Sequence, residues 1–163
     1  AYGEDWFARG YGEDDFFIKK YTNAVTATDA QTSGIAYHVI RYADVLLMYA
    51  ECLANNGDMG GAAAFVQQVR DRANLPDREA EFAGFSLDAF MEQLEHERIM
   101  ELAIEGKRWY DLKRWNLLQG AELEELREHD FEFETFTPGE DEFIPIPQTE
   151  IDRNPNLVGN SAN

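Results

Sequence analysis

Apolar positions recur with the spacing of a helix in two long segments of this chain. In the first segment, residues 37–76, two adjacent apolar rows predict a helix over residues 41–55 that other elements cover on most sides. The dipeptide Gly57-Asp58 then predicts a turn, with Asp58 as the N-cap of a second helix that stops before Pro76. The inner row of that second helix consists of Ala62, Val66, Val69 and Ala73. We therefore expect a helical hairpin.

The second segment, residues 85–119, predicts two helices that meet at Gly106. Ser86 has the side-chain oxygen that an N-cap needs, while Phe85 and Phe90 occupy the two positions of a hydrophobic staple. Gly106 adopts a left-handed conformation at low cost, so it is expected to end the first helix and form the corner. The apolar stripe of the first helix consists of Leu87, Met91, Leu94, Ile99, Leu102 and Ala103.

The helix after the corner, over roughly residues 107–118, carries two of the three tryptophans of the chain. Leu112 and Trp115 share one face of it because they are three residues apart. We expect Trp109 and Trp115 to be buried in an interior that both helices of the second segment share.

One residue of the first helix, Arg98, interrupts the apolar stripe. A buried guanidinium needs a carboxylate, because an unpaired buried charge is expensive. The candidate partners are Glu51, Glu101 and Glu105. Arg98 could form a structural ion pair or could hold an anionic ligand, and the many acids around it favour the ion pair. On the preceding hairpin, Arg41 and Asp44 are spaced to pair with each other.

The ends of the chain have other patterns. Residues 1–36 are rich in aromatics and glycine and keep neither helical nor strand periodicity. Residues 120–163 begin with an acidic helix over residues 121–129, and the alternation of Phe131 and Phe133 with glutamates then predicts a strand. A turn at residues 137–140 and an apolar return with two prolines, Phe143 to Pro147, predict a short β-hairpin, followed by a tail with one helical turn.

The charge of the chain limits its partners. Its formal net charge is −18, and of the five spans 1–33, 34–76, 77–106, 107–119 and 120–163 only 107–119 has more basic than acidic residues. Without an extended basic face the chain is not expected to bind nucleic acid through phosphates. Cys52 is the single cysteine, so an intrachain disulfide is impossible, and we expect it to be a buried apolar filler. No run of residues is long and apolar enough to span a bilayer.

Catalytic and metal-binding motifs are not found. His96-Glu97 begins like a zinc protease motif, but Met100 stands where the second histidine ligand would be. The acidic loops 13–15 and 140–142 lack the spacing of an EF-hand. We therefore expect no enzyme, no metal site and no cofactor.

The aromatic residues near the start of the chain allow two interpretations. Aromatic rings match the apolar faces of sugar rings, so Trp6, with Tyr2 and Tyr11, could form a stacking platform for a glycan. Alternatively, these rings cover the helical core. The spacing of the aromatic residues, taken alone, slightly favours this second interpretation.

The first hairpin resembles a tetratricopeptide unit, with Gly57-Asp58 at the turn. Five blocks together resemble the SusD/RagB family, surface nutrient-binding lipoproteins of Gram-negative outer membranes, and match the C-terminal part of these proteins. The blocks are FFIKKYT at 16–22, IRYADVLLMYAE at 40–51, VRDRANLP at 69–76, HERIMELAIEGKRWYDLKRW at 96–115 and FIPIPQTEIDRNPNL at 143–157.

The resemblance implies a mainly α fold of tetratricopeptide-like helical hairpins with long irregular loops. It implies non-catalytic capture of a polysaccharide or oligosaccharide, or in some members of peptides, for a SusC-like TonB-dependent transporter. The location would be the extracellular face of the outer membrane, reached through a lipid anchor that this chain lacks. The alternative is a tetratricopeptide-like scaffold that binds a protein or peptide without a sugar site.

Overall fold

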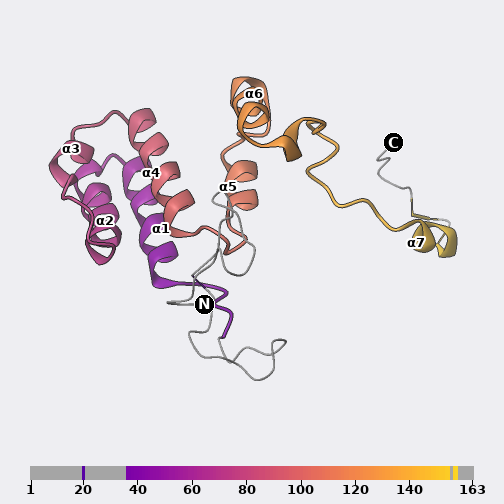
Figure 1. Cartoon of the computed structure of the whole chain (residues 1–163), viewed down its shortest axis with the longest axis horizontal. Coiled ribbons are helices and arrows are strands. Elements are labelled where there is room, and N and C mark those ends of the chain that lie inside the picture. Colours follow the sequence, from indigo (N-terminus) through magenta and orange to yellow (C-terminus); the bar gives the residue numbers. More distant parts are fainter. Residues whose placement is uncertain (1–19, 21–35, 155, 158–163) are drawn as a thin grey trace, which may run out of the picture. The chain divides into compact units, whose positions relative to one another are not determined.

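The computed structural model describes residue 20, residues 36–154 and residues 156–157, and within these residues the only regular elements are helices (Figure 1). The α-helices are α1 (Tyr42–Asn55), α2 (Met59–Arg72), α3 (Glu79–Ala83), α4 (Leu87–Glu101), α5 (Arg108–Arg114), α6 (Gly120–His129) and α7 (Gln148–Arg153), and the 3₁₀ helix η2 covers Phe131–Phe133. The mainly α fold predicted from the sequence is confirmed.

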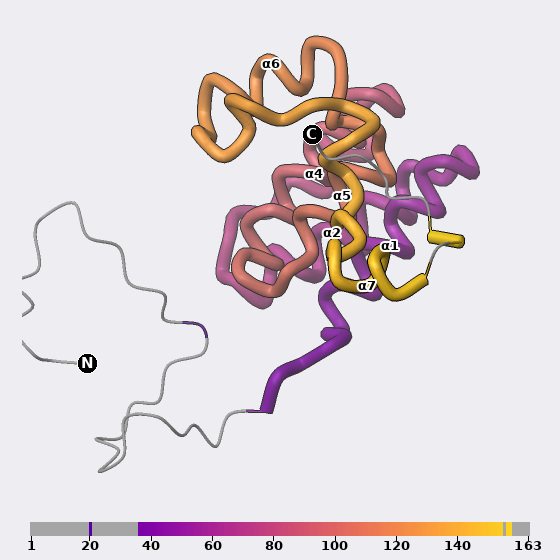
Figure 2. Tube along the Cα trace, turned by 90° about the vertical axis from the view of Figure 1, so that its right-hand side faces the viewer, coloured from indigo at the N-terminus to yellow at the C-terminus, as the bar shows by residue number. Residues whose placement is uncertain are grey.

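The predicted hairpin of the first segment is formed by α1 and α2, which pack against each other (Figures 1 and 2). Gly57 connects them with a φ of +86°, a conformation that favours glycine. Asp58 caps α2, because its carboxylate accepts a hydrogen bond of 2.9 Å from the backbone N–H of Gly61. The hairpin encloses a core to which α1 contributes Leu46, Leu47, Ala50 and Ala54, and α2 contributes Ala62, Ala63, Val66 and Val69. Ala73 is the one member of the predicted inner row that is exposed, at the end of α2.

The short helix α3 covers one end of this core and was not predicted, since five residues are too few to show periodicity. Its Phe82 is fully buried. The guanidinium of Arg78 lies 4.7 Å from the ring centre of Phe82, and that of Arg70 lies 5.5 Å from it. Phe82 therefore joins α3 to the hairpin through both apolar packing and cation–π contacts.

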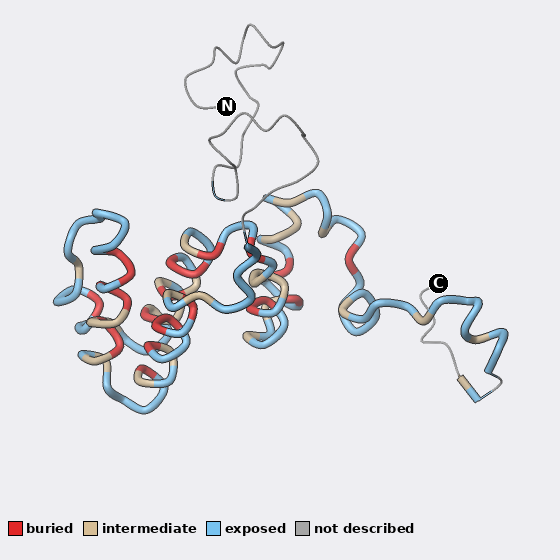
Figure 3. Tube along the Cα trace, turned by 90° about the horizontal axis from the view of Figure 1, so that it is seen from below, coloured by how far each residue is buried: buried red, intermediate tan, exposed pale blue. Residues whose placement is uncertain are grey.

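Helix α4 begins as predicted, with the hydroxyl of Ser86 accepting a hydrogen bond from the backbone N–H of Ala89. Its inner face differs from the predicted stripe. Leu87 and Ile99 are exposed, and the buried positions of α4 are Phe90, Leu94, Glu97 and Arg98. The inner face of α4 therefore changes from apolar residues to charged residues toward its C-terminal end. Apolar periodicity alone assigns the wrong residues to the buried face there. Figure 3 shows how buried positions recur along the helices.

The corner after α4 is present, but it takes more residues than predicted. Helix α4 ends at Glu101, and the chain turns through residues 102–106, where Ile104 and Gly106 have φ values of +69° and +70°. A glycine tolerates this conformation easily, whereas a β-branched isoleucine adopts it rarely. The second helix, α5, is correspondingly shorter than the predicted span 107–118.

The two indoles do not share one interior. Trp115 packs against the core cluster formed by α1, α2, α3 and α4, whereas Trp109 packs against a separate cluster formed by Leu112, Leu118, Leu123 and Phe136. The expectation of a shared interior is therefore wrong. Trp109 lies in the first turn of α5 and Trp115 follows its last residue, so the two indoles lie at opposite ends of this short helix and reach different clusters.

The predicted acidic helix is confirmed as α6, but the predicted β-hairpin is not formed. Phe131–Phe133 is the 3₁₀ helix η2, where the carboxylate of Asp130 accepts a hydrogen bond of 3.0 Å from the backbone N–H of Glu132. Phe133 packs at 5.6 Å from Phe136, while Phe131 is exposed, so the alternation reflects one turn of helix rather than a strand. The turn at residues 137–140 is confirmed, with Gly139 at a φ of +87°.

Candidate functional site

A cluster of buried charges lies where α1, α4 and α5 meet, and Arg98 is at its centre. Arg98 is 4% exposed, and its Nε donates a hydrogen bond of 2.8 Å to Oδ2 of Asp111. Its Nη1 lies 3.0 Å from Oδ1 of Asp44, an ion pair whose alignment is not that of a hydrogen bond. Lys107 lies 3.2 Å from the other oxygen of Asp44. The structural ion pair expected of Arg98 is confirmed, but its partners are these aspartates and none of the three predicted glutamates.

Each of those three glutamates pairs with another arginine. Glu105, whose side chain is fully buried, accepts a hydrogen bond of 2.8 Å from Nε of Arg41. Glu101 pairs with Arg41 at 2.7 Å and also with Arg72. Burial by itself would lower the pKa of Arg41, but its hydrogen bonds to Glu105 and Glu101 outweigh this effect and raise the pKa. The predicted pairing of Arg41 with Asp44 is therefore wrong, because both residues turn toward the α4–α5 corner instead.

Glu51 on α1 completes the network from the other side of α5. One oxygen of its carboxylate accepts hydrogen bonds from Nη1 of Arg114 at 2.6 Å and from the indole N–H of Trp115 at 2.8 Å. Arg114 also bonds to Asp111 at 2.9 Å. Burial would lower the pKa of Arg114, but the hydrogen bonds to Glu51 and Asp111 raise it. Arg114 thus stays charged and links α1 to α5.

The basic residues of the span 107–114 form ion pairs and hydrogen bonds with other residues of the same chain. Lys107 and Arg114 take part in the cluster just described, and Arg108 pairs with Glu95 at 2.7 Å. Lys113 donates a hydrogen bond of 2.9 Å to the carbonyl oxygen of Glu142 and lies 4.8 Å from the ring centre of Phe143. This positive span therefore holds elements of the fold together, and each of its four cations has a partner within the described residues.

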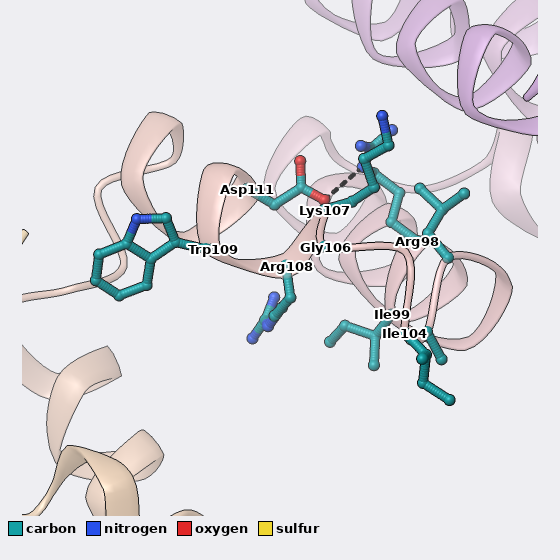
Figure 4. Close-up of a pocket in the computed structure, with 10 residues that line it drawn as sticks. Arg98, Ile99, Ile104, Gly106, Lys107, Arg108, Trp109 and Asp111 are labelled. Carbon is teal, nitrogen blue, oxygen red and sulfur yellow. Dashed lines mark hydrogen bonds and ion pairs between the residues drawn. The ribbon is translucent and has the colours of Figure 1, made fainter. Parts of the chain in front are cut away.

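A hollow of about 350 Å³ lies at the corner between α4 and α5, within the size range of small-molecule sites. Its lining includes Ile99, Ile104 and Trp109 together with Arg108 and the Arg98–Asp111 pair. Figure 4 shows Ile99, Ile104 and Arg108 pointing to the same side of the corner. The exposed isoleucines could contact an apolar group, whereas Arg108 is already paired with Glu95.

The hollow was not predicted, because Ile99 was assigned to the buried stripe of α4. The signal that could have located it is the apolar dipeptide Ala103-Ile104, which is separated from Gly106 by a single residue and therefore lies within the corner, where side chains cannot all turn inward. The residues proposed for glycan stacking, Tyr2, Trp6 and Tyr11, lie outside the described residues. In the part of the chain that the structure describes, no group of three or more His, Cys, Asp or Glu side chains is placed to hold a metal ion.

None of the helices in the described ranges combines the length and the apolar character that crossing a membrane requires.

The helical hairpin, its Gly-Asp turn and the charged α4–α5 corner define a tetratricopeptide-like, all-helical protein in the described part of the chain. Comparison with known proteins then identifies its family. The profile of the SusD family matches residues 4–162, nearly the whole sequence, and the chain therefore belongs to the SusD family.

Individual relatives agree with this assignment. The chain is 36% identical over 129 residues to SusD-like protein P25 of Formosa agariphila, covering 76% of this chain and 23% of that protein. It is 32% identical over 152 residues to SusD-like protein P2 of the same organism, covering 88% and 29%. The crystal structure of a SusD superfamily protein from Bacteroides vulgatus superposes with a TM-score of 0.64 at 34% identity, covering 76% of this chain and 27% of that one. The chain spans less than a third of the length of these relatives.

Proposed function

We propose that the polypeptide to which this chain belongs binds a polysaccharide or oligosaccharide without cleaving it and delivers it to a TonB-dependent transporter of the outer membrane. The observation that carries the proposal is the match of the SusD family over residues 4–162. The proposed location is the extracellular face of the outer membrane, held there by a lipid anchor.

The charge distribution supports a ligand that is not recognised through a basic surface. The cations of the span 107–114 are paired internally, and the chain as a whole carries a net charge of −18. A neutral glycan meets no repulsion from such a surface, whereas a polyanion does. We therefore place neutral glycans first among the candidate ligands.

For the contact itself we propose the aromatic residues near the start of the chain, with Trp6 as the main stacking residue and Tyr2 and Tyr11 beside it. Substitution of Trp6 by alanine is expected to weaken glycan binding about tenfold or more, because an aromatic face contributes on the order of 1 kcal/mol or more beyond the area it buries. Affinity gel electrophoresis against a panel of soluble neutral and anionic polysaccharides measures this directly.

The matched control is Phe131→Ala, which removes an aromatic ring that is 75% exposed and outside the proposed platform. Equal retardation of Trp6→Ala and the unmodified chain in every gel would remove Trp6 from the site. Retardation by a peptide matrix but by no polysaccharide would favour the scaffold without a sugar site. Release of reducing ends from any polysaccharide by the pure chain would contradict a non-catalytic role.

The transporter is tested separately from the ligand. We expect a tagged polypeptide expressed from the whole reading frame to retain a TonB-dependent transporter when outer membranes are solubilised in mild detergent. Mass spectrometry of the retained proteins identifies it, and an unrelated tagged outer-membrane lipoprotein is the control. Recovery of no transporter above that control would contradict the proposed partnership while leaving glycan binding open.

A further inference from the structure

A second, smaller hollow lies between the C-terminal end of α5 and the loop that follows the turn at residues 137–140. Its volume is about 230 Å³, below the range of about 300–1,000 Å³ that is usual for drug-sized ligands, so it has room for a single ring. Its lining includes Lys113, Asn116, Leu118 and Gln119 on one side, and Glu142 and Phe143 on the other. The two sides come from segments that are not adjacent in the sequence, so the fold creates this hollow.

Lys113 holds the two sides of the second hollow together. Its ammonium group donates a hydrogen bond of 2.9 Å to the carbonyl oxygen of Glu142 and lies 4.8 Å from the ring centre of Phe143. The carboxylate of Glu142 in turn accepts a hydrogen bond of 2.6 Å from the backbone N–H of Gly139. Contacts of the chain with itself therefore shape the hollow, and ligand sites are usually preformed in this way.

Two side-chain amides in the lining are not used by the fold. Asn116 follows the end of α5 with a φ of +62°, a place where the backbone conformation matters and the amide does not. Gln119 occupies the N-cap position of α6 but makes no capping hydrogen bond. Within the described part of the chain, neither amide has a hydrogen-bond partner. An amide has both donors and an acceptor, so the pair is complementary to hydroxyl groups.

The rest of the lining combines apolar surface with balanced charge. The ring of Phe143 is 59% exposed, and the buried Leu118 adds an aliphatic contact. The side chains of Lys113 and Glu142 have opposite charges and are both engaged, so the hollow has no net charge to attract an ion. A sugar ring has an apolar face of C–H groups and an edge of hydroxyls. Aromatic surface beside two amides therefore fits a neutral sugar better than an anion or a purely apolar group.

We propose that the second hollow binds one ring of a neutral glycan, which stacks on Phe143 and forms hydrogen bonds with the amides of Asn116 and Gln119. This site is additional to the platform proposed around Trp6. It rests on the proposed function in one respect, because the ring belongs to the same class of ligand. It does not depend on the transporter.

The two amides give a direct test, because side-chain NH₂ groups have signals of their own in a proton–nitrogen correlation spectrum. The isotope-labelled chain is titrated with the methyl glycosides of glucose, galactose, mannose and xylose. We expect saturable shifts of both NH₂ signals with at least one glycoside and a dissociation constant in the millimolar range, since one ring makes few contacts. Asn116→Gly and Gln119→Ala each remove one signal and so assign them.

Substitution of the aromatic ring has a matched control on the same loop. Phe143→Ala is expected to raise the dissociation constant of the glycoside about tenfold or more, because the stacking surface is lost. Ile144→Ala removes a side chain that is 93% exposed and outside the hollow, and no change is expected.

Asn116→Gly separates binding from a structural role at the helix end. Glycine keeps the left-handed backbone at low cost, so the urea midpoint is expected to stay unchanged. Loss of the amide is expected to weaken binding of the glycoside about three- to tenfold, as for one hydrogen bond. An unchanged dissociation constant would show that Asn116 only ends α5.

The outcomes distinguish the second hollow from the Trp6 platform. Absence of shifts at both amides with every glycoside would overturn the site, while Trp6-dependent retardation in gels would still support glycan binding. Shifts with methyl glucuronide alone would overturn the neutral ligand, and shifts that glycerol produces equally would show that the hollow does not select a ring. The shifts are expected to persist in Trp6→Ala, and their loss there would assign them to the platform instead.

Discussion

Arg98→Met is expected to lower the free energy of unfolding by about 3–5 kcal/mol, because it leaves two buried aspartates without their shared cation. Asp44 and Asp111 are 3% and 4% exposed, so water can compensate little of the loss. Urea-induced unfolding followed by circular dichroism measures the effect, and urea is preferred to guanidinium because it does not screen charges.

The matched control for this substitution is Arg108→Met. Arg108 forms an ion pair of similar length with Glu95, but its side chain is 37% exposed, so about 0–1 kcal/mol is expected. Adding Asp111→Asn to Arg98→Met should recover part of the lost stability, since Asp111 otherwise shares its remaining cation, Arg114, with Glu51. If Arg98→Met unfolds at the same urea concentration as the unmodified chain, the cluster is not structural and an anionic ligand of Arg98 becomes the better explanation.

Phe82→Ala is expected to cost about 3–5 kcal/mol of unfolding free energy, the usual range for a fully buried phenylalanine. The ring is the main apolar contribution of α3 to the core, and it also receives the guanidinium groups of Arg70 and Arg78. The loss therefore combines a cavity with two cation–π contacts. The same urea titration measures it.

Phe131→Ala is the control for that experiment, because its ring is 75% exposed and a change within about 0.5 kcal/mol is expected. A loss below about 1 kcal/mol for Phe82→Ala would mean that α3 is not held to the hairpin by this side chain.

The parts of the fold that the sequence predicts well are those governed by local chemistry. The Gly57-Asp58 turn, the Ser86 cap and the corner at Gly106 all depend on the conformation or hydrogen bonding of one or two residues, and all three are present. The family blocks likewise predicted the family, because they keep their order and spacing over most of the chain.

The predictions that failed depend on contacts between residues far apart in sequence. The partners of Arg98 come from two other helices, and many nearby acids make the choice among them impossible from spacing alone. The exposure of Cys52 and Ile99 could not be predicted either, because the spacing of apolar residues along a helix does not show which of its sides another element covers. The stacking role of Trp6 stays a prediction.

The separation of the two indoles has a practical consequence for spectroscopy. Trp115 donates its N–H to a carboxylate beside one apolar cluster, whereas Trp109 lies 6.1 Å from the ring of Phe136 in the other. Their emission therefore reports on different local environments within a single molecule. With Trp6 and one of these two replaced by phenylalanine in turn, the fluorescence of the remaining indole tells whether the two clusters melt as one cooperative unit or in succession.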